Sequence, residues 1–356
     1  MSKQRATNTN GLDASFASDN VAGVSPGILA ALGRDNDAAA LPYGADPVSA
    51  ELADWAKDEF GPQSEIYPVF NGTGANVVSL QAMLPRWGAA ICSAGAHVNN
   101  DEGAAPERVG AVKLLPRAAS DGKLTPADIE DELGAVGFVH AAQPLAVTLT
   151  ESTEVGTLYS AEEIAAVAET AHRHGMGVHI DGARLSNAAA ALGTGLGELT
   201  AGTGVDVVSL GGTKNGAMAA EAVVVINPQR VAGTGYVRKY SMQLASKQRF
   251  VSAQLLELFS TELWRENAAR ANAQAAALGA GLAALEGVRL STEPVVNAVF
   301  PEVPQEIAAR IQSRYLAHVW DTAPSGNPVL RLMCSWQTTD EQIQSLVDCA
   351  AGHQQP

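Results

Sequence analysis

The chain has few cysteines, few aromatic residues and no long apolar run. Cys92, Cys334 and Cys349 lie far apart without the spacing of a metal site, and three cysteines cannot all pair, so we expect reduced thiols and no bound metal. No stretch reaches the apolar length of a membrane span, and the polar start lacks the apolar core of a secretion signal. A cytoplasmic protein without a membrane segment is expected.

Positive charge is also scarce. The chain carries 23 lysines and arginines against 38 aspartates and glutamates, which gives a formal net charge of −15. A nucleic-acid-binding protein presents a basic patch to the phosphate backbone, and no segment here concentrates enough positive charge to form one. We therefore expect no nucleic-acid partner, and we expect small molecules or further copies of this chain instead.

The order of apolar patterns predicts an α/β protein. A chain of 356 residues can form two domains or one large one. Short β-rich runs alternate with helical patterns, which indicates a mostly parallel sheet flanked by helices, and a helical, Ala- and Leu-rich stretch at 247–285 leads to a small α+β domain. We predict an N-terminal segment (1–25), a large domain (26–246), and linking helices with a small C-terminal domain (247–356). The predicted strands are 89–92, 112–115, 146–149, 177–180, 205–210, 222–226, 288–290, 298–300 and 329–332, and the predicted helices are 74–84, 125–133, 161–174, 185–192, 304–314 and 340–349.

Two predicted strands end abruptly in charged residues. Residues 177–184 (GVHIDGAR) contain Asp181, and residues 205–216 (VDVVSLGGTKNG) contain Lys214. Ligands of α/β proteins bind at the carboxyl ends of such strands. Pyridoxal phosphate needs a lysine amine for a Schiff base and a carboxylate facing its pyridine nitrogen, so Lys214 and Asp181 together suit this cofactor.

Each of these residues also has an ordinary structural explanation. Most lysines are solvated surface groups, but the three glycines between 209 and 216 let the backbone approach a ligand, and the apolar neighbours of Lys214 would lower the pKa of its amine. Asp181 could instead cap a helix at 185–192. That alternative does not explain why Arg184 follows so closely.

The two motifs H-x-D-G-A-R (179–184) and S-x-G-G-T-K-N-G (209–216) resemble those of the L-threonine aldolases, a group of fold-type I pyridoxal-phosphate enzymes. Further segments match in order and spacing, so the resemblance covers nearly the whole chain. These segments are 16–20, 43–46, 72–76, 96–97, 101–104, 151–154 and 331–332.

The resemblance implies a fold and a reaction. The fold would be that of the fold-type I transferases, with a large, mostly parallel seven-stranded sheet and a small C-terminal α+β domain. The reaction would be the pyridoxal-phosphate-dependent cleavage of L-threonine, allo-threonine or phenylserine to glycine and an aldehyde. Lys214 would hold the cofactor, Asp181 would keep its ring nitrogen protonated, and His97 would stack on the ring and accept the β-hydroxyl proton.

The cofactor phosphate is expected at the Gly-rich turn that opens the helix near residue 74. A helix start offers free backbone N–H groups, so the amides of Gly72 and Gly74 and the hydroxyl of Thr73 are the candidate ligands, although an ordinary turn would look similar. A family segment that supplies a cation near the phosphate corresponds to 238–249. Lys247 is the first candidate and Arg249 the second; a solvated helix face explains these charges almost as well.

Histidines near the motifs have less certain roles. His97 is either structural or, as in the resembled family, the stacking ring and base. His179 lies two residues before Asp181 on the same strand face, where it either orients Asp181 or packs. Glu154 stands where several members of the resembled family carry histidine, so the contact with the β-hydroxyl group is expected to differ in this chain.

The substrate is expected to be held mainly through its carboxylate. Arg184 and Arg331 are the predicted clamp, because a guanidinium binds a carboxylate with two parallel hydrogen bonds, and Arg184 is also counted with the cofactor site. Ser18 and Tyr43 are further candidate substrate contacts. In an alternative interpretation of the same N-terminal segment, Asp19 and Asn20 cap a helix that begins near Pro26.

Other functions share several of these residues. Another fold-type I reaction, such as β-elimination or transamination, would use the same lysine and aspartate. A ligand-binding protein without turnover is less consistent with the presence of Lys214, Asp181 and Arg331 together. The family forms dimers and tetramers with shared active sites, so we expect a homo-oligomer.

Overall fold

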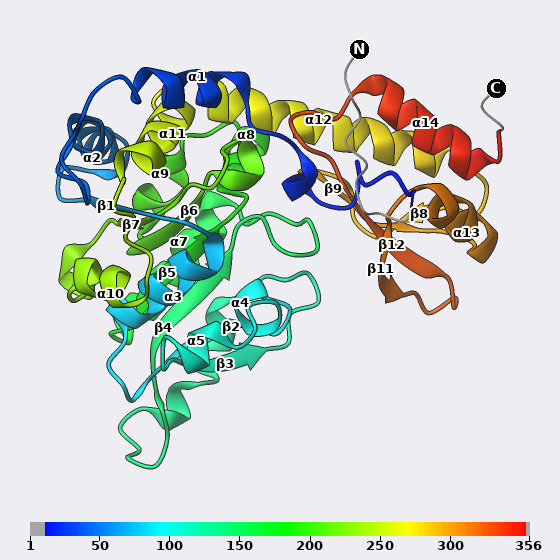
Figure 1. Ribbon diagram of the computed structural model, residues 1–356. Helices are drawn as coiled ribbons and strands as arrows, with labels where there is room; N and C mark the ends of the chain where they lie inside the picture. The colour runs from blue at the N-terminus through cyan, green and yellow to red at the C-terminus, as the bar shows by residue number, and fades with distance from the viewer. Residues whose placement is uncertain (1–10, 354–356) are drawn as a thin grey trace. The chain divides into compact units, whose positions relative to one another are not determined.

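The computed structural model describes residues 11–353 and divides into two compact units (Figure 1). The larger unit is Val24–Glu266, and the smaller unit holds the described residues up to Gly23 and from Asn267 onward. The boundary thus falls inside helix α12 (Leu263–Ala283) and not at 246/247. Helix α11 (Arg249–Phe259) accounts for the difference, because its apolar side chains belong to the core of the larger unit.

The larger unit contains a seven-stranded sheet in the order β1-β7-β6-β5-β4-β2-β3. The neighbouring strands from β6 through β5, β4 and β2 to β3 pair in parallel, and β7 is antiparallel to both β6 and β1. The predicted large, mostly parallel seven-stranded sheet is therefore confirmed. The strands are β1 (Glu65–Val69), β2 (Gly88–Ser93), β3 (Lys113–Arg117), β4 (Gln143–Thr150), β5 (Gly177–Gly182), β6 (Val207–Gly211) and β7 (Glu221–Val225).

Strand β1 is absent from the strands predicted from the sequence. It contains Pro68, which cannot donate a ladder hydrogen bond, and it begins with an exposed Glu65. Proline is tolerated in strands at the edge of a sheet, and β1 occupies one edge. Because β1 pairs with β7 on one side only, Pro68 does not prevent this segment from forming a strand, although its apolar pattern is weak.

Alternating strand residues face two layers of helices. Val178, Ile180 and Val208 point into the main core with residues from α1, α2, α7, α8, α9 and α11. The intervening residues, such as Val207, face the buried helix α3. This alternation follows from the two-residue period of a strand, and it places Asp181 on the α3 face. The helices of this unit, with their short 3₁₀ turns, are α1 (Pro26–Arg34), α2 (Pro47–Phe60), α3 (Gly72–Met83), α4 (His97–Asn100), α5 (Ala105–Arg108), α6 (Pro126–Glu130), η2 (Leu133–Ala135), α7 (Ala161–Arg173), α8 (Leu185–Leu192), α9 (Leu196–Leu199), η3 (Ala201–Thr203), η4 (Thr213–Asn215), η5 (Pro228–Arg230), α10 (Thr234–Tyr240) and α11.

The smaller unit is an α+β fold with its own core. Its strands form antiparallel pairs in the order β11-β12-β10-β8, and β9 pairs with β12. The N-terminal segment belongs to it, since Phe16 is fully buried in this core and its carbonyl accepts from Met333 N at 2.9 Å. Among the described residues, the helices are too short or too polar to cross a membrane. The elements are η1 (Asp19–Val21), β8 (Arg289–Leu290), β9 (Ala298–Val299), β10 (Pro301–Glu302), α13 (Gln305–Arg314), β11 (His318–Thr322), β12 (Pro328–Met333) and α14 (Asp340–Ala351).

Candidate active site

Polar side chains gather at the carboxyl ends of the central parallel strands. Asp181 of β5 lies in register with Thr150 of β4 and with Ser209 of β6. Lys214 follows the end of β6 within η4 and is half-buried. His97 opens α4, which follows the neighbouring strand β2. The carboxyl ends of parallel strands all lie on the same side of the sheet, so the segments that follow these strands come close together there.

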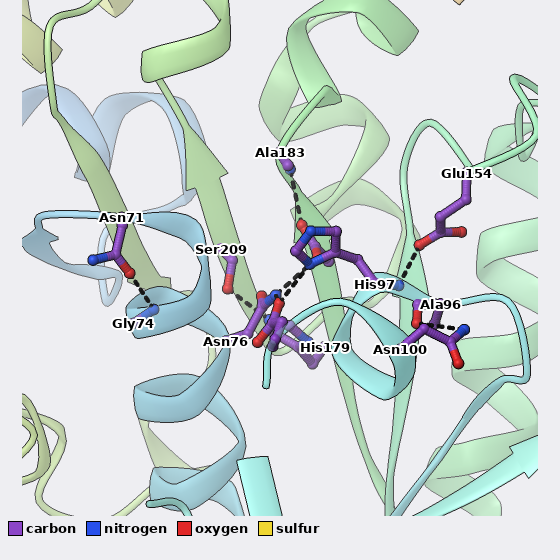
Figure 2. Close-up of polar contacts among 12 residues, drawn as sticks. Asn71, Gly74, Asn76, Ala96, His97, Asn100, Glu154, His179, Ala183 and Ser209 are labelled. Atoms are coloured by element: carbon purple, nitrogen blue, oxygen red, sulfur yellow. Dashed lines mark hydrogen bonds and ion pairs between the residues drawn. The ribbon is translucent and has the colours of Figure 1, made fainter. Parts of the chain in front are cut away.

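Asp181 is held by two neutral donors. Its side chain is buried, with Oδ2 accepting from Asn76 Nδ2 at 2.8 Å and Oδ1 accepting from the Ala183 amide at 3.0 Å (Figure 2). The residue at the N-cap of α8 is Arg184, so Asp181 does not cap that helix. A buried carboxylate with neutral donors is suited to face a cationic group of a ligand.

His179 packs beneath this site and does not orient Asp181 through a hydrogen bond. Its Nε2 is 2.9 Å from Ser209 Oγ (Figure 2). Its Nδ1 is 2.8 Å from Thr148 Oγ1, so both ring nitrogens are already used. Burial lowers the pKa of His179 to about 4, although the nearby Asp181 charge opposes this. The prediction that this ring could orient Asp181 is corrected to a structural role between β4 and β6.

The turn that carries Lys214 is held tightly against its neighbours. A Cβ on Gly211 would lie 2.7 Å from the Ala183 backbone, so only glycine permits this approach between the end of β6 and the segment after Asp181. Glu221 of β7 lies beneath the turn and accepts from the amides of Gly212 at 3.0 Å and Thr213 at 3.3 Å. Burial raises the pKa of Glu221 to about 7, while hydrogen bonding and the Lys214 charge act in the other direction.

His97 is fixed both at its ring and at its backbone. Its amide donates to Glu154 Oε1 at 2.7 Å (Figure 2). Its Nδ1 lies 3.0 Å from Glu102 Oε1. The hydrogen bond with Glu102 raises the pKa of His97; burial and Lys214 act in the opposite direction. Burial raises the pKa of Glu154, which the His97 amide partly offsets. Because Glu154 accepts a hydrogen bond from the amide of His97, the first residue of α4, it stabilises the start of this helix.

The start of α3 has one of its predicted phosphate donors already bonded. Gly74 donates its amide to the side chain of Asn71 at 2.7 Å, in a side-chain cap of the helix (Figure 2). Gln243 covers the same turn, because it accepts from Phe70 N at 3.0 Å and its amide group would lie about 2.5 Å from a Cβ on Gly74. The remaining candidates at this helix start are the amides of Gly72 and Thr73 and the Thr73 hydroxyl.

The predicted cations and Tyr43 lie on other segments of the larger unit. Lys247 is exposed in the turn before α11, and Arg249 donates to Ala38 O at 2.7 Å, so Arg249 already has a structural partner. Tyr43 is exposed, and its ring lies 4.9 Å from Lys239 Nζ. Arg184 is half-buried at the start of α8.

Two predicted substrate contacts belong to the smaller unit. Arg331 lies in β12 with its guanidinium 5.1 Å from the centre of the Trp320 ring. Ser18 caps η1 by accepting from Asn20 N at 3.2 Å. Asp19 and Asn20 belong to that turn, and the residue before α1 is Ser25, so they do not form the predicted cap of α1.

Sequence reasoning missed several residues that complete the site. Asn76 and Glu102 were inside segments that resemble the aldolase family, but nothing in the sequence assigned them a role. Asn76 follows Gly72 by one helical turn and so faces the same side, which is a usable signal. The partner of each is set by packing of α3 against the sheet. The missed residues are Asn71, Asn76, Glu102, Glu221 and Gln243.

These residues fit pyridoxal phosphate. The buried Asp181 carboxylate suits a protonated pyridine nitrogen, and the start of a 12-residue helix suits a phosphate. His97 offers a ring that is partly exposed, with 43% of its side-chain surface accessible, and so is available for stacking. Lys214 would supply the amine from the adjoining turn.

Several known proteins are similar in sequence to this chain. Residues 15–305 match the family model described as β-eliminating lyase. The chain is 36% identical to the low specificity L-threonine aldolase of Pseudomonas sp. (strain NCIMB 10558), over 93% of this chain and 95% of that protein. It is 37% identical to the protein of the same description from Pseudomonas aeruginosa, over 93% and 95% of the two chains.

Solved structures show the same architecture. The threonine aldolase of Leishmania major superposes with a TM-score of 0.88 at 28% identity, covering 94% of this chain and 98% of that one. A serine palmitoyltransferase from S. paucimobilis with bound PLP superposes with a TM-score of 0.67 at 19% identity, covering 96% and 86% of the two chains. The second likeness concerns the fold alone.

Proposed function

Because the chain belongs to the β-eliminating lyase family, and matches its low specificity L-threonine aldolases over nearly the full length, we propose how its residues cleave threonine to glycine and an aldehyde. The chain is a pyridoxal-phosphate-dependent aldehyde-lyase. The observation that carries the residue assignment is that Asp181, Lys214 and His97 all lie at the carboxyl ends of parallel strands of one sheet, β5, β6 and β2.

Lys214 and Asp181 would hold the cofactor and set its charge. When bound, pyridoxal phosphate supplies an electron sink for the pair of electrons released from the Cα–Cβ bond. The Lys214 amine is the attachment group, and the Asp181 carboxylate would keep the pyridine nitrogen protonated. The two N–H donors on Asp181 fix its orientation without neutralising its charge.

His97 would take the proton from the β-hydroxyl group. A positioned imidazole is an effective base near neutral pH. Its Nδ1 is already used by Glu102, which leaves Nε2 as the nitrogen for the substrate. The amides of Gly72 and Thr73 at the start of α3 would bind the cofactor phosphate, with Lys247 preferred to Arg249 as the accompanying cation because Arg249 already donates to Ala38 O.

The carboxylate clamp from Arg184 and Arg331 stays a prediction. We expect Arg331→Ala to lower kcat/KM for threonine by about ten- to a hundredfold, because a charge-assisted hydrogen bond contributes roughly 1.5–3 kcal/mol. The absorption spectrum of the bound cofactor should be unchanged. Loss of cofactor together with activity would move Arg331 to the cofactor site or to a structural role.

The substrate range is the part of the function that experiment can define most directly. We propose that allo-threonine and phenylserine are cleaved as well as threonine. The test is to incubate the purified holoenzyme with each amino acid and to measure glycine together with acetaldehyde or benzaldehyde. Production of a keto acid and ammonia without glycine would instead indicate β-elimination, and amino-group exchange with a keto acid would indicate transamination.

We also propose a homo-oligomer that works in the cytoplasm. Large side chains are exposed on α10 and on the turn that follows it: Tyr236 is 82% accessible and Met242 is 76% accessible. A second copy of the chain could bury this surface. Cys92, Cys334 and Cys349 are unpaired thiols, as a reducing compartment favours. Light scattering of the purified protein would give the mass of the assembly.

A further inference from the structure

Glu102 is a buried acid that the reaction as described above does not use. It follows α4, its side chain is 1% exposed, and its Oε1 atom is the meeting point of two hydrogen bonds. Asn76 Nδ2 donates to this oxygen at 2.8 Å, and His97 Nδ1 lies 3.0 Å from it. A buried carboxylate that contacts the ring of the proposed base is placed to influence that base.

The side-chain amide of Asn76 bridges the two acids, Glu102 and Asp181. Nδ2 carries two hydrogens and no lone pair to share, and it donates to Glu102 Oε1 and to Asp181 Oδ2, each at 2.8 Å. The opposite amide orientation would place Oδ1 against two carboxylate oxygens and would require both acids to be protonated. Donation from one nitrogen therefore fits two ionised carboxylates.

An ionised Glu102 also defines the proton on His97. A carboxylate only accepts hydrogen bonds, so the contact at 3.0 Å requires a proton on Nδ1. In the neutral ring the other nitrogen then carries the lone pair. Glu154 holds the backbone amide of His97, whereas Glu102 contacts its ring. Different residues therefore fix the position of the His97 backbone and the tautomer of its ring.

We propose that Glu102 is a positioning residue for aldol cleavage, which holds His97 as the Nδ1–H tautomer so that Nε2 accepts the β-hydroxyl proton. This inference rests on the proposed role of His97. The substrate O–H bond breaks as the Nε2–H bond forms, and the aldehyde C=O bond forms as the Cα–Cβ electron pair stays with the glycine fragment. A proton then delivered to that carbon completes glycine, so atoms and charge balance without another reactant.

Three charged groups act on the His97 ring, and a further acidic residue contacts its backbone. Glu102 contacts the ring and Glu154 contacts the backbone amide. Asp181 of β5 and Lys214 of η4 act through space. The hydrogen bond from Glu102 has the largest effect and raises the pKa of His97, and Asp181 adds to it, whereas Lys214 lowers the pKa. Removal of the Glu102 charge should therefore lower the pKa of His97.

The test compares Glu102→Gln with Glu154→Gln, since both acids contact His97 but only Glu102 contacts its ring. The holoenzyme is labelled with ¹⁵N-histidine, and the His97 signals are assigned by their loss in His97→Phe. We expect the parent to show a protonated Nδ1.

In Glu102→Gln, the ring pKa and the acidic limb of kcat/KM should move down by about one pH unit. The rate should fall by about a hundredfold, because a base in the wrong tautomer loses a contribution of roughly 10²–10⁴. Glu154→Gln should leave the ring pKa and the acidic limb in place.

The outcomes separate this inference from the function on which it rests. An unprotonated Nδ1 in the parent, or an unchanged ring titration in Glu102→Gln, would overturn the role of Glu102. If His97→Phe kept the parental rate and acidic limb, His97 would not be the base, and the ring titration would still report on Glu102. Should Glu102→Gln fail to fold, the tautomer in the parent and the titration of Glu102→Asp, in which a shorter acid weakens the contact, decide the question.

Discussion

The two ends of the central strands use buried aspartates differently. At the amino end, Asp206 precedes β6 and accepts from His172 Nε2 at 2.9 Å, Val178 N at 2.8 Å and Asn227 Nδ2 at 3.0 Å. These donors come from α7, from β5 and from the segment after β7. At the carboxyl end, the Asp181 side chain accepts from two neutral donors, Asn76 Nδ2 and Ala183 N, within the part of the chain that the structure describes. One aspartate ties elements together, while the other keeps acceptor capacity for a ligand.

The difference shows that burial of an acid does not by itself identify a catalytic residue. Asp206 is 1% exposed and Asp181 is 4% exposed, so exposure does not separate them. Their surroundings do, because the segment near Asp181 also presents Lys214 and His97, whereas Asp206 contacts groups that fix the backbone. The comparison predicts that changes at the carboxyl end affect rate and that changes at the amino end affect stability.

The largest effect is expected for Lys214. Lys214→Ala should abolish cleavage, because no other group on this turn offers an amine for the cofactor, and its midpoint of thermal unfolding without cofactor should stay close to that of the parent. Lys214→Arg is the matched control, since it keeps the positive charge but not the nucleophile, and it should be equally inactive. Glycine production at the parental rate by either variant would remove Lys214 from the mechanism.

Asp181→Asn should lower kcat by about 10²–10³-fold or more, because each unit lost from the pKa of the cofactor's ring nitrogen is about 1.4 kcal/mol. Circular dichroism should show a folded protein, since the new side chain is nearly isosteric. The measurement is the steady-state rate at saturating threonine and cofactor. A near-parental kcat would contradict the proposed role of this carboxylate.

Asp206→Asn is the counterpart at the opposite end of the strands. One of its oxygens becomes a donor that faces N–H groups, so the free energy of unfolding should fall by about 1–3 kcal/mol. The rate per folded molecule should be unchanged at low temperature. Urea unfolding and activity of the same preparation test both statements, and a rate loss as large as that of Asp181→Asn would break the contrast between the two ends.

Glu151 is a structural acid beside Asp181, and its effect is confined to the pH dependence of stability. It is fully buried and accepts from Tyr159 N at 3.1 Å, and burial raises its pKa from 4.5 to about 8. Because the folded-state pKa is raised, the stability from this group is fully present below about pH 4.5 and is lost as the pH rises through about 8.

Glu151→Gln should therefore remove a stability slope of at most about 1.4 kcal/mol per pH unit over that window. The difference in unfolding free energy between parent and variant is measured by urea titration at several pH values from 5 to 8. It should shift in favour of the variant as the pH rises. Parallel pH dependences for the two proteins would show that Glu151 is already ionised when folded.

Much of the fold could be predicted from local patterns. The apolar runs that became β4, β5, β6 and β7 bury both faces, so they stand out in the sequence. Strand β1 does not stand out, because Pro68 weakens its pattern and its pairing with β7 is a long-range contact. The predicted helix at 125–133 forms only as the short α6 followed by η2, since Gly134 and its neighbours favour turns.

The boundary between the two units could not be predicted from the sequence, because it also depends on long-range contacts. The stretch from 247 onward is helical, as predicted, but helical pattern does not say which core a helix joins. Val251 and Leu255 of α11 lie in the core that also contains Ile28, so α11 belongs with the larger unit. Phe16, from the opposite end of the chain, lies in the core of the smaller unit.

The sequence by itself determined where the proposed chemistry lies, because a buried strand that ends in small and charged residues places those residues at the carboxyl end of the sheet. It thereby indicated Asp181 and Lys214. Only the tertiary structure decided what surrounds them. Asn76 of α3 donates to Asp181 of β5 across 105 positions and to Glu102, which follows α4, across 26. Local preferences act over a few residues, whereas these hydrogen bonds depend on which faces of distant elements meet, and that is fixed by the core as a whole.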